Sequence, residues 1–215
     1  MRKTSILTCV MIATPLALAL PAYADTFTTF SQPAAPYTTT TIDYGGGDGS
    51  LNNITSIGPF TLSSPMEEAG PVPQNWETWN TPPAVESSTP YVLFSNSADS
   101  VTLTLVGGPT TVGFELEPEE FDTDPVSASF YNENGALIDT INLNVSGSGG
   151  ALLFALEDTT AGASIGSVVI TDSAPDTFAI AQLRANPTPE PGSLSLLGLG
   201  LLGLALVAYR KTLNA

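Results

Sequence analysis

Carboxylates are the side chains with which this chain could most readily do chemistry, because it contains 21 Asp and Glu residues and no His. Without an imidazole, Ser–His and Cys–His couples and His-ligated zinc are excluded, so catalysis would need an Asp/Glu pair, as in glycoside hydrolysis. The densest group lies in the stretch ELEPEEFDTD and consists of Glu115, Glu117, Glu119, Glu120, Asp122 and Asp124. A strand end followed by a solvated acidic loop explains the same pattern and is favoured over catalysis.

Calcium is the metal ion that these carboxylates could bind, since Ca²⁺ takes oxygen ligands from carboxylates and loop carbonyls. Asp122 and Asp124 form one candidate pair. Asp43 and Asp48 form another, because they flank three glycines in DYGGGDGS and glycine lets backbone carbonyls turn inward. EF-hand spacing is absent, and a flexible Gly-rich turn is the alternative for the second pair. Calcium is therefore a candidate cofactor, and no other cofactor is predicted.

Two tryptophans, Trp76 and Trp79, lie in PQNWETWN, within a stretch from Ser63 to Pro90 that contains six prolines. This composition predicts a long irregular excursion, and such loops tend to be functional or disordered. Exposed indoles at this spacing could stack on sugar rings, which makes the pair a candidate ligand site. The alternative is that both rings pack against the body and hold the loop in place.

The elements that must position these side chains are predicted to be antiparallel strands. Short alternating stretches bounded by Gly, Pro, Asn and Asp recur, and no helical periodicity is found in residues 25–187. The predicted strands are Thr26–Phe30, Tyr37–Asp43, Ile54–Leu62, Tyr91–Phe94, Ser100–Val106, Thr111–Pro118, Val126–Phe130, Ala136–Val145, Ala151–Glu157, Ser164–Thr171 and Thr177–Ala185. Their spacing favours an all-β sandwich or barrel.

Alternation within these strands predicts which side chains face the core. In TVGFELEP, Val112, Phe114 and Leu116 are expected to point inward, and Glu115 and Glu117 outward. The residues that follow VSASF read Tyr-Asn-Glu-Asn-Gly, and this turn predicts a hairpin with ALIDTINLNV.

The charge of residues 25–187 limits the partners of this predicted domain. These 163 residues include 20 acidic residues and one basic residue, Arg184, which is a formal charge of −19. Such a body repels phosphate backbones, so no nucleic-acid partner is predicted. Because Cys9 is the only cysteine, this domain has no disulfide and no thiolate nucleophile.

Residues 1–24 have the layout of a secretory signal peptide. Two basic residues precede an apolar run from Ile6 to Leu20, and Ala22-Tyr23-Ala24 supplies the small residues, Ala22 and Ala24, of a cleavage site. A permanent N-terminal anchor is the alternative, and Pro15 within the apolar run disfavours it. Cleavage after Ala24 is therefore expected.

The C-terminal residues 188–215 combine a proline-rich spacer, an apolar run and a basic end. Pro189, Glu190 and Pro191 are followed by an apolar run from Leu194 to Ala208, and then by Arg210-Lys211. This predicts a single transmembrane helix with its C-terminus in the cytoplasm and the acidic body outside. The run is shorter than the roughly 20 residues of a typical span.

The same tail resembles the PEP-CTERM sorting signal of exported bacterial proteins. The resemblance rests on Pro189, Glu190, Pro191, Arg210 and Lys211, on the small-residue helix between them, and on the N-terminal signal peptide. It implies processing by an exosortase-type membrane enzyme near the triplet. It also implies a transient stay in the inner membrane and delivery to the surface or extracellular matrix of a polysaccharide-producing bacterium.

The body is similar to β-sandwich ectodomains found among such proteins, over residues 111–185. This resemblance implies a jelly-roll sandwich like that of carbohydrate-binding modules. Ala181 and Gln182 stand where the pattern often has Asp-Asn, so any support from that Asp is missing here.

Together these features predict a non-enzymatic exported protein associated with extracellular polysaccharide in a biofilm matrix. A lectin-like carbohydrate-binding module, with or without calcium, is the first alternative. A carboxylate-based glycoside hydrolase is the second, although no Asp/Glu pair is singled out by the sequence.

Overall fold

The computed structural model describes residues 26–33, 53–96, 98–160, 162–174 and 177–186, and the regular secondary structure within these ranges consists of β-strands alone. The strands are β1 (Phe27–Phe30), β2 (Asn53–Ile57), β3 (Phe60–Pro71), β4 (Tyr91–Phe94), β5 (Ser100–Leu105), β6 (Thr111–Pro118), β7 (Thr123–Asn132), β8 (Leu137–Ser146), β9 (Leu152–Asp158), β10 (Ile165–Asp172) and β11 (Phe178–Ala185). Every pairing is antiparallel, which confirms the predicted all-β class.

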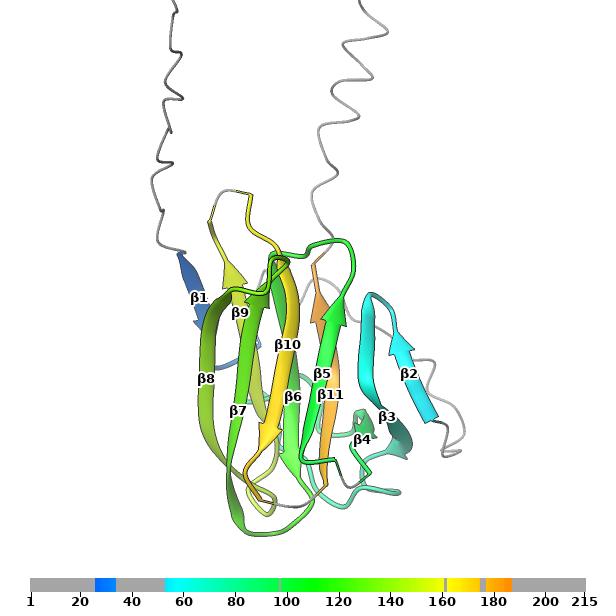
Figure 1. Cartoon of the computed structure of the whole chain (residues 1–215). Coiled ribbons are helices and arrows are strands. Elements are labelled where there is room, and N and C mark those ends of the chain that lie inside the picture. The colour runs from blue at the N-terminus through cyan, green and yellow to red at the C-terminus, as the bar shows by residue number, and fades with distance from the viewer. Residues whose placement is uncertain (1–25, 34–52, 97, 161, 175–176, 187–215) are drawn as a thin grey trace, which may run out of the picture.

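The strands form one continuous sheet that folds over on itself. Its order is β1-β9-β6-β11-β4-β3-β5-β10-β7-β8, and β2 pairs with β3 beside this path. In Figure 1, β8, β7, β10 and β5 form a front layer, with β9, β6 and β11 behind it. Contacts of β6 with β8 and β10 cross between the two layers. The jelly-roll connectivity expected from the family resemblance stays a prediction.

Strand β3 belongs to both layers because it changes partner along its length. Its first residues, Phe60–Leu62, pair with β5, and its last part, from Glu67, pairs with β4. Pro65 lies between these two registers, where its missing N–H interrupts neither ladder. The expectation that Ser63–Pro71 would be irregular was therefore wrong.

One expected strand proved to be two. Residues Ile54–Leu62 form the end of β2, a turn at Gly58 and Pro59, and the start of β3. The other predicted strands that fall on described residues are confirmed to within a few residues, and Tyr37–Asp43 lies outside the described ranges. The predicted hairpin of β7 and β8 is also confirmed, with Asn132 N donating to Ala136 O at its turn.

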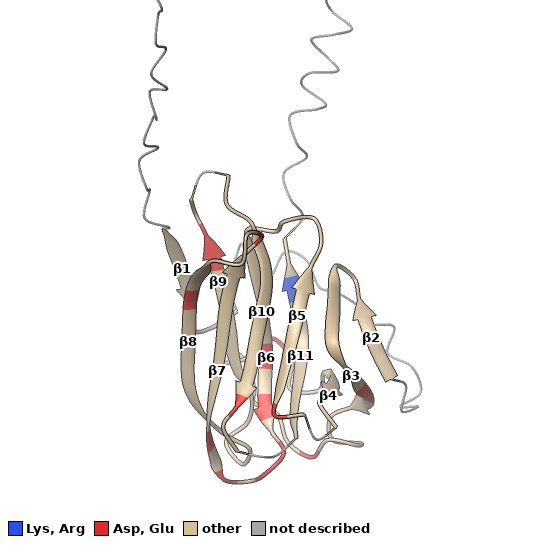
Figure 2. Ribbon diagram, in the orientation of Figure 1, with Lys and Arg blue, Asp and Glu red and all other residues tan. Residues whose placement is uncertain are grey.

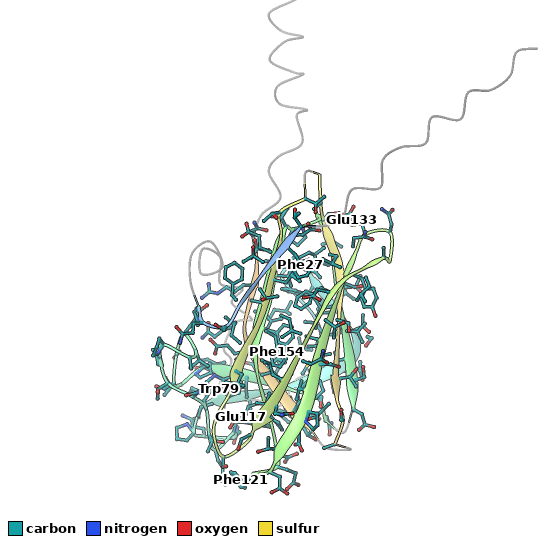
Figure 3. The ribbon with its side chains drawn as sticks, turned by 90° about the vertical axis from the view of Figure 1, so that its left-hand side faces the viewer. Phe27, Trp79, Glu117, Phe121, Glu133 and Phe154 are labelled. Atoms are coloured by element: carbon teal, nitrogen blue, oxygen red, sulfur yellow. The ribbon has the colours of Figure 1, made fainter. Side chains whose placement is uncertain are left out.

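The main core fills the space between the layers. Its largest fully buried side chains include Phe60, Phe114, Phe130, Phe154 and Phe178, and the rings of Phe114 and Phe154 stack with centroids 5.7 Å apart. Figure 3 shows Phe154 in the interior between the strands. Val112 and Leu116 belong to the same core as Phe114, so the predicted inward face of β6 is confirmed.

A bulge in β11 keeps this core apolar. The pairing of β11 with β6 shifts between Ala181 and Arg184, and Gln182 has a φ of 50°. Ile180 and Leu183 consequently both reach the main core, although strict alternation would put them on opposite faces. The same shift places Arg184 on the outer face, away from the phenylalanines.

The predicted sorting tail lies outside the described residues, as do the signal peptide and the predicted boundaries at 24/25 and 187/188. In the ranges that the structure describes, no helix is long and apolar enough to cross a membrane.

Candidate functional site

Residues 72–90, which we call the covering segment, lie over the outer face of the layer that contains β6 and β11. This irregular segment forms a second core with that face, made of Ala69, Val72, Trp76, Trp79, Val85, Val92, Ala151, Ala179 and Ala181. The alanines of β11, together with Ala151 just before β9, leave room for the two indoles. As a result, β6 is buried along its whole length, on both of its faces.

The two tryptophans are buried in this second core, with Trp76 8% and Trp79 9% exposed. Their indole N–H groups donate to β6: Trp76 Nε1 to Glu117 Oε2 at 3.3 Å, and Trp79 Nε1 to Glu115 Oε2 at 3.0 Å. A sugar-stacking platform needs exposed ring faces, so the prediction of an exposed Trp76–Trp79 platform does not fit this geometry. The contacts are those of the packing alternative.

Glu115 and Glu117 do point away from the main core as expected, but they are buried and not solvated. The expectation of solvent on this side of β6 was wrong because the covering segment fills that side. Beyond the strand, Glu119, Glu120 and Asp122 are exposed, as an acidic loop requires.

A short chain of hydrogen bonds connects Glu117, Thr78 and the backbone carbonyl of Gly147. Thr78 Oγ1 lies 2.6 Å from Glu117 Oε1 and 2.9 Å from Gly147 O. A hydroxyl has one proton and can donate to only one of these oxygens. A protonated Glu117 resolves the conflict, because it can donate to Thr78 while Thr78 donates to Gly147 O. Burial raises the pKa of Glu117 to about 7, against the lowering effect of the Thr78 and Trp76 contacts, which agrees with this arrangement.

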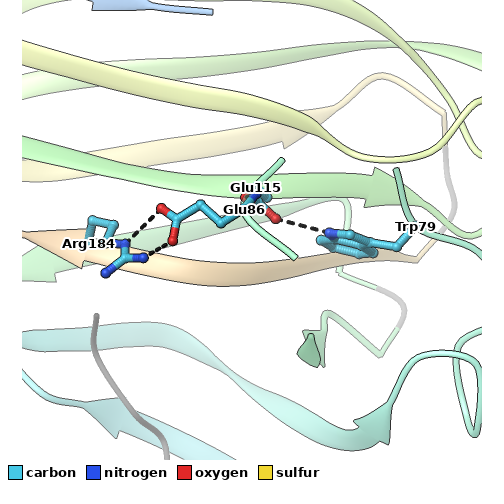
Figure 4. A network of polar contacts seen from close by, with 4 residues as sticks. All are labelled: Trp79, Glu86, Glu115 and Arg184. Atoms are coloured by element: carbon cyan, nitrogen blue, oxygen red, sulfur yellow. Dashed lines mark hydrogen bonds and ion pairs between the residues drawn. The ribbon is translucent and has the colours of Figure 1, made fainter. Parts of the chain in front are cut away.

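Glu115 has a different set of partners. Its Oε1 accepts from the backbone N of Glu86 at 2.6 Å, and its Oε2 accepts from Trp79. Burial raises the pKa of Glu115 to about 8, although the Trp79 hydrogen bond lowers it. Glu86 in turn forms an ion pair with Arg184, whose Nε donates to Glu86 Oε1 at 2.9 Å. Figure 4 shows how these four residues tie the covering segment to β6 and β11.

An open hollow lies at the end of this network, between the covering segment and the loop that follows β6. It has a volume of about 280 Å³ and is lined by Asn75, Trp76, Glu77, Thr78, Glu119 and Phe121. Phe121 is 55% exposed, so its ring offers apolar surface at the rim of the hollow. Figure 3 shows Phe121 at the same end of the molecule as Trp79 and Glu117.

Gly147 holds the two walls of the hollow together. Its N donates to Asp122 O at 3.1 Å, and its carbonyl accepts from Thr78. A Cβ at this position would lie 2.0 Å from the backbone oxygen of Glu120, so only glycine fits. The loop with Glu119 and Phe121 is thereby fixed against Thr78 of the covering segment.

The candidate calcium residues are not gathered into a site in the described structure. Asp122 is exposed and Asp124 is buried at the start of β7, while Asp43 and Asp48 lie outside the described ranges. Over the part of the chain that is described, no group of three or more acidic side chains is placed to share a metal ion.

The predicted sorting residues Pro189, Glu190, Pro191, Arg210 and Lys211 and the cleavage residues Ala22 and Ala24 also lie outside the described structure.

Sequence reasoning missed Thr78, Glu86 and Phe121 as parts of a site. One signal for Glu86 was available, since Arg184 is the one basic residue of the body and lies in a predicted strand, where it needs a carboxylate partner. Thr78 and Phe121 have no comparable signal, because their roles depend on where two loops meet.

The described body is an acidic, all-β antiparallel domain in which Arg184 on β11 is the one basic residue. Figure 2 shows the acidic residues of this domain mainly at strand ends and in loops. The chain continues from this domain into a PEP-CTERM protein-sorting motif, which is matched at residues 187–211. The motif implies export, a membrane-anchored stage and processing by an exosortase-type enzyme.

Comparison with curated proteins finds no match. Among solved structures, the chain is similar to the enzymatically active domain of bacteriophage CBA120 tailspike protein 4, with 17% sequence identity and a TM-score of 0.37. That likeness covers 68% of this chain and 21% of the tailspike chain, so this chain spans about a fifth of that structure.

Proposed function

We propose that this is a non-enzymatic surface or extracellular-matrix protein, delivered by PEP-CTERM sorting, whose acidic β-domain associates with exopolysaccharide in a biofilm. The observation that supports it most is the sorting motif at residues 187–211, which begins directly after the last described strand residues. Processing at Pro189-Glu190-Pro191 would release the domain from the inner membrane with its fold intact.

The contacts of the two buried carboxylates support a non-enzymatic domain. Glu115 and Glu117 each have protein partners at both oxygens, namely Trp79 and Glu86 for the first and Trp76 and Thr78 for the second. A glycoside hydrolase needs one carboxyl to protonate a leaving group and another to attack or to activate water. These two are engaged in holding the covering segment.

The hollow beside Phe121 supports a carbohydrate contact and favours the lectin-like alternative over the enzyme. It combines an exposed aromatic ring with an amide and carboxylates, which are side chains that orient sugar hydroxyls and C–H faces. Its volume, about 280 Å³, is at the lower limit for ligand sites, so it suits one sugar residue of a longer chain.

Sorting is tested by expressing the full-length chain in a bacterium with an exosortase and measuring the mass of the protein released to the surface. The wild-type protein is expected without residues 194–215, and Glu190→Ala is expected to stay membrane-bound with its tail. Release of a wild-type chain that still contains residues 194–215 would contradict the proposal.

Polysaccharide association and catalysis are separated with the same released protein. It is expected to co-sediment with exopolysaccharide from the host and to release no soluble sugar from it. Sugar release that persists in a purified preparation would instead favour the glycoside hydrolase.

A further inference from the structure

The hollow lined by Asn75, Trp76, Glu77, Thr78, Glu119 and Phe121 has a charge pattern that selects among sugars. Glu77 and Glu119 are both exposed and line it from two different segments, the covering segment and the loop after β6. No basic side chain is among the residues that line it. A ligand with a positive charge would meet two carboxylates there without a competing protein cation.

The one basic residue of the body cannot neutralise this hollow. Arg184 pairs with Glu86 and lies opposite Gly113 in the β11–β6 register, whereas the hollow adjoins the other end of β6, where Phe178 lies opposite Pro118. At a strand rise of about 3.3 Å per residue, five residues separate these ends by roughly 16 Å, beyond the Debye length at physiological salt. The negative potential of the hollow is therefore uncompensated.

The exposed ring of Phe121 adds a second requirement. At 55% exposure it offers an apolar surface at the rim, against which the C–H face of a pyranose can pack. An ammonium group beside an aromatic ring gains further attraction from the ring quadrupole. A simple metal ion would use the carboxylates but not the ring, and a uronic acid would be repelled by the carboxylates.

From these features we infer that the hollow binds an amino-sugar residue of a polysaccharide, with its ammonium group at Glu77 and Glu119 and its apolar face on Phe121. This inference rests on the proposed polysaccharide association and names the class of sugar. A neutral, N-acetylated residue of the same size has no charge for the two carboxylates, so the structure predicts a preference for the free amine.

The test measures binding of the full-length chain in detergent to immobilised glucosamine, N-acetylglucosamine and glucuronic acid oligomers of equal length. The buffer is held near pH 6 with EDTA, so that the amine is protonated and divalent cations cannot bridge. We expect the glucosamine oligomer to bind about tenfold more tightly than the N-acetylated one, and to be released by salt. The glucuronic acid oligomer should not bind.

Matched variants assign the binding to this hollow. Glu77→Gln, Glu119→Gln and Phe121→Ala change exposed side chains and should each weaken glucosamine binding several-fold with unchanged Tm. Glu120→Gln changes an exposed carboxylate on the same loop that does not line the hollow, and it should bind like the wild type.

Two different failures can be distinguished. In the first, the protein associates with the host exopolysaccharide but binds the glucosamine and N-acetylglucosamine oligomers equally. This result would overturn the amino-sugar inference and leave the proposed function standing. The amino-sugar inference is also overturned if Glu120→Gln loses as much affinity for the glucosamine oligomer as Glu77→Gln does, because binding would then depend on the net charge of the protein and not on the hollow. No binding to any polysaccharide would overturn both.

Discussion

Glu115 and Glu117 point to the same side of β6, yet their partners give them different hydrogen-bonding requirements. Glu117 faces one N–H donor, from Trp76, and one hydroxyl that is already shared with Gly147. Glu115 faces two N–H donors, from Trp79 and from the backbone of Glu86. A neutral group that both donates and accepts fits the first position. At the second position both side-chain atoms must accept, which the two oxygens of a carboxyl group do in the protonated as well as the ionised form, and which an amide nitrogen cannot do.

Glutamine substitution tests this difference directly. In Glu117→Gln, the amide can donate to Thr78 and accept from Trp76, so we expect the free energy of unfolding to change by less than about 1 kcal/mol. In Glu115→Gln, the amide N–H must face a donor, so a loss of about 1–3 kcal/mol is expected. Urea unfolding of the two variants measures both values, and an equal loss in both would contradict the assigned contacts.

At the scale of elements, the covering segment is irregular in its backbone and still fixed in place. Its two indoles fill a core against the alanines of β11 and Ala151, and the Glu86–Arg184 ion pair anchors its later part. Removing one partner of a buried ion pair typically costs more than the pair itself contributes, so this contact keeps the segment in register with β11. Gly147 provides the corresponding anchor at the hollow.

Gly147→Ala should therefore both destabilise the domain and open the hollow. The added methyl group would meet the backbone oxygen of Glu120 at 2.0 Å, so the loop with Glu119 and Phe121 must move. We expect a loss of about 1–3 kcal/mol in unfolding free energy and weaker polysaccharide binding. Ser148→Ala, at the exposed next position, is the control and should leave binding unchanged. A Gly147→Ala protein with wild-type Tm would show that the loop is not held here.

At the scale of the whole molecule, the negative charge of the body and the buried Glu115 and Glu117 both make the domain less stable as pH rises. Residues 25–187 have a formal charge of −19, and repulsion among the exposed carboxylates grows as they ionise. Glu115 and Glu117 add to this because their pKa values are raised from 4.5 to about 8 and about 7. The unfolded chain releases these protons at lower pH than the folded chain does.

Stability should consequently fall as pH rises from about 4.5 to about 8. Both groups are protonated in either state below this window, and in the window the folded chain binds more protons than the unfolded chain. One pKa unit corresponds to about 1.4 kcal/mol, so the combined loss is on the order of several kcal/mol. Thermal unfolding between pH 5 and 9 measures it. Glu117→Gln should reduce the slope and Glu120→Gln should not, and a Tm that rises over this range would refute the assignment.

Much of the sheet could be predicted from local pattern, because alternation reports which face of a strand is buried. The positions of β5 to β11 follow from such alternation to within a few residues, and the turn at Asn132–Gly135 follows from its Asn and Gly residues. The two errors near β3 have different causes. The turn at Gly58-Pro59 has a local signal, because a Gly-Pro dipeptide marks a turn. The strand through Pro65 has no such signal. Because Pro65 has no N–H, it interrupts a strand only where a neighbouring strand would accept a hydrogen bond from that position. The neighbouring strands here, β4 and β5, come from other parts of the chain.

The sequence by itself determined the class of the body, its acidic character, its lack of imidazole and thiol chemistry, and its sorting tail, because composition and short motifs are properties of consecutive residues. Only the tertiary structure decided the roles of Trp76, Trp79, Glu115 and Glu117, which form a buried seam instead of an exposed platform and a solvated face. Those roles depend on the covering segment folding back over β6, and burial of that kind is set by contacts between residues 29 to 41 positions apart.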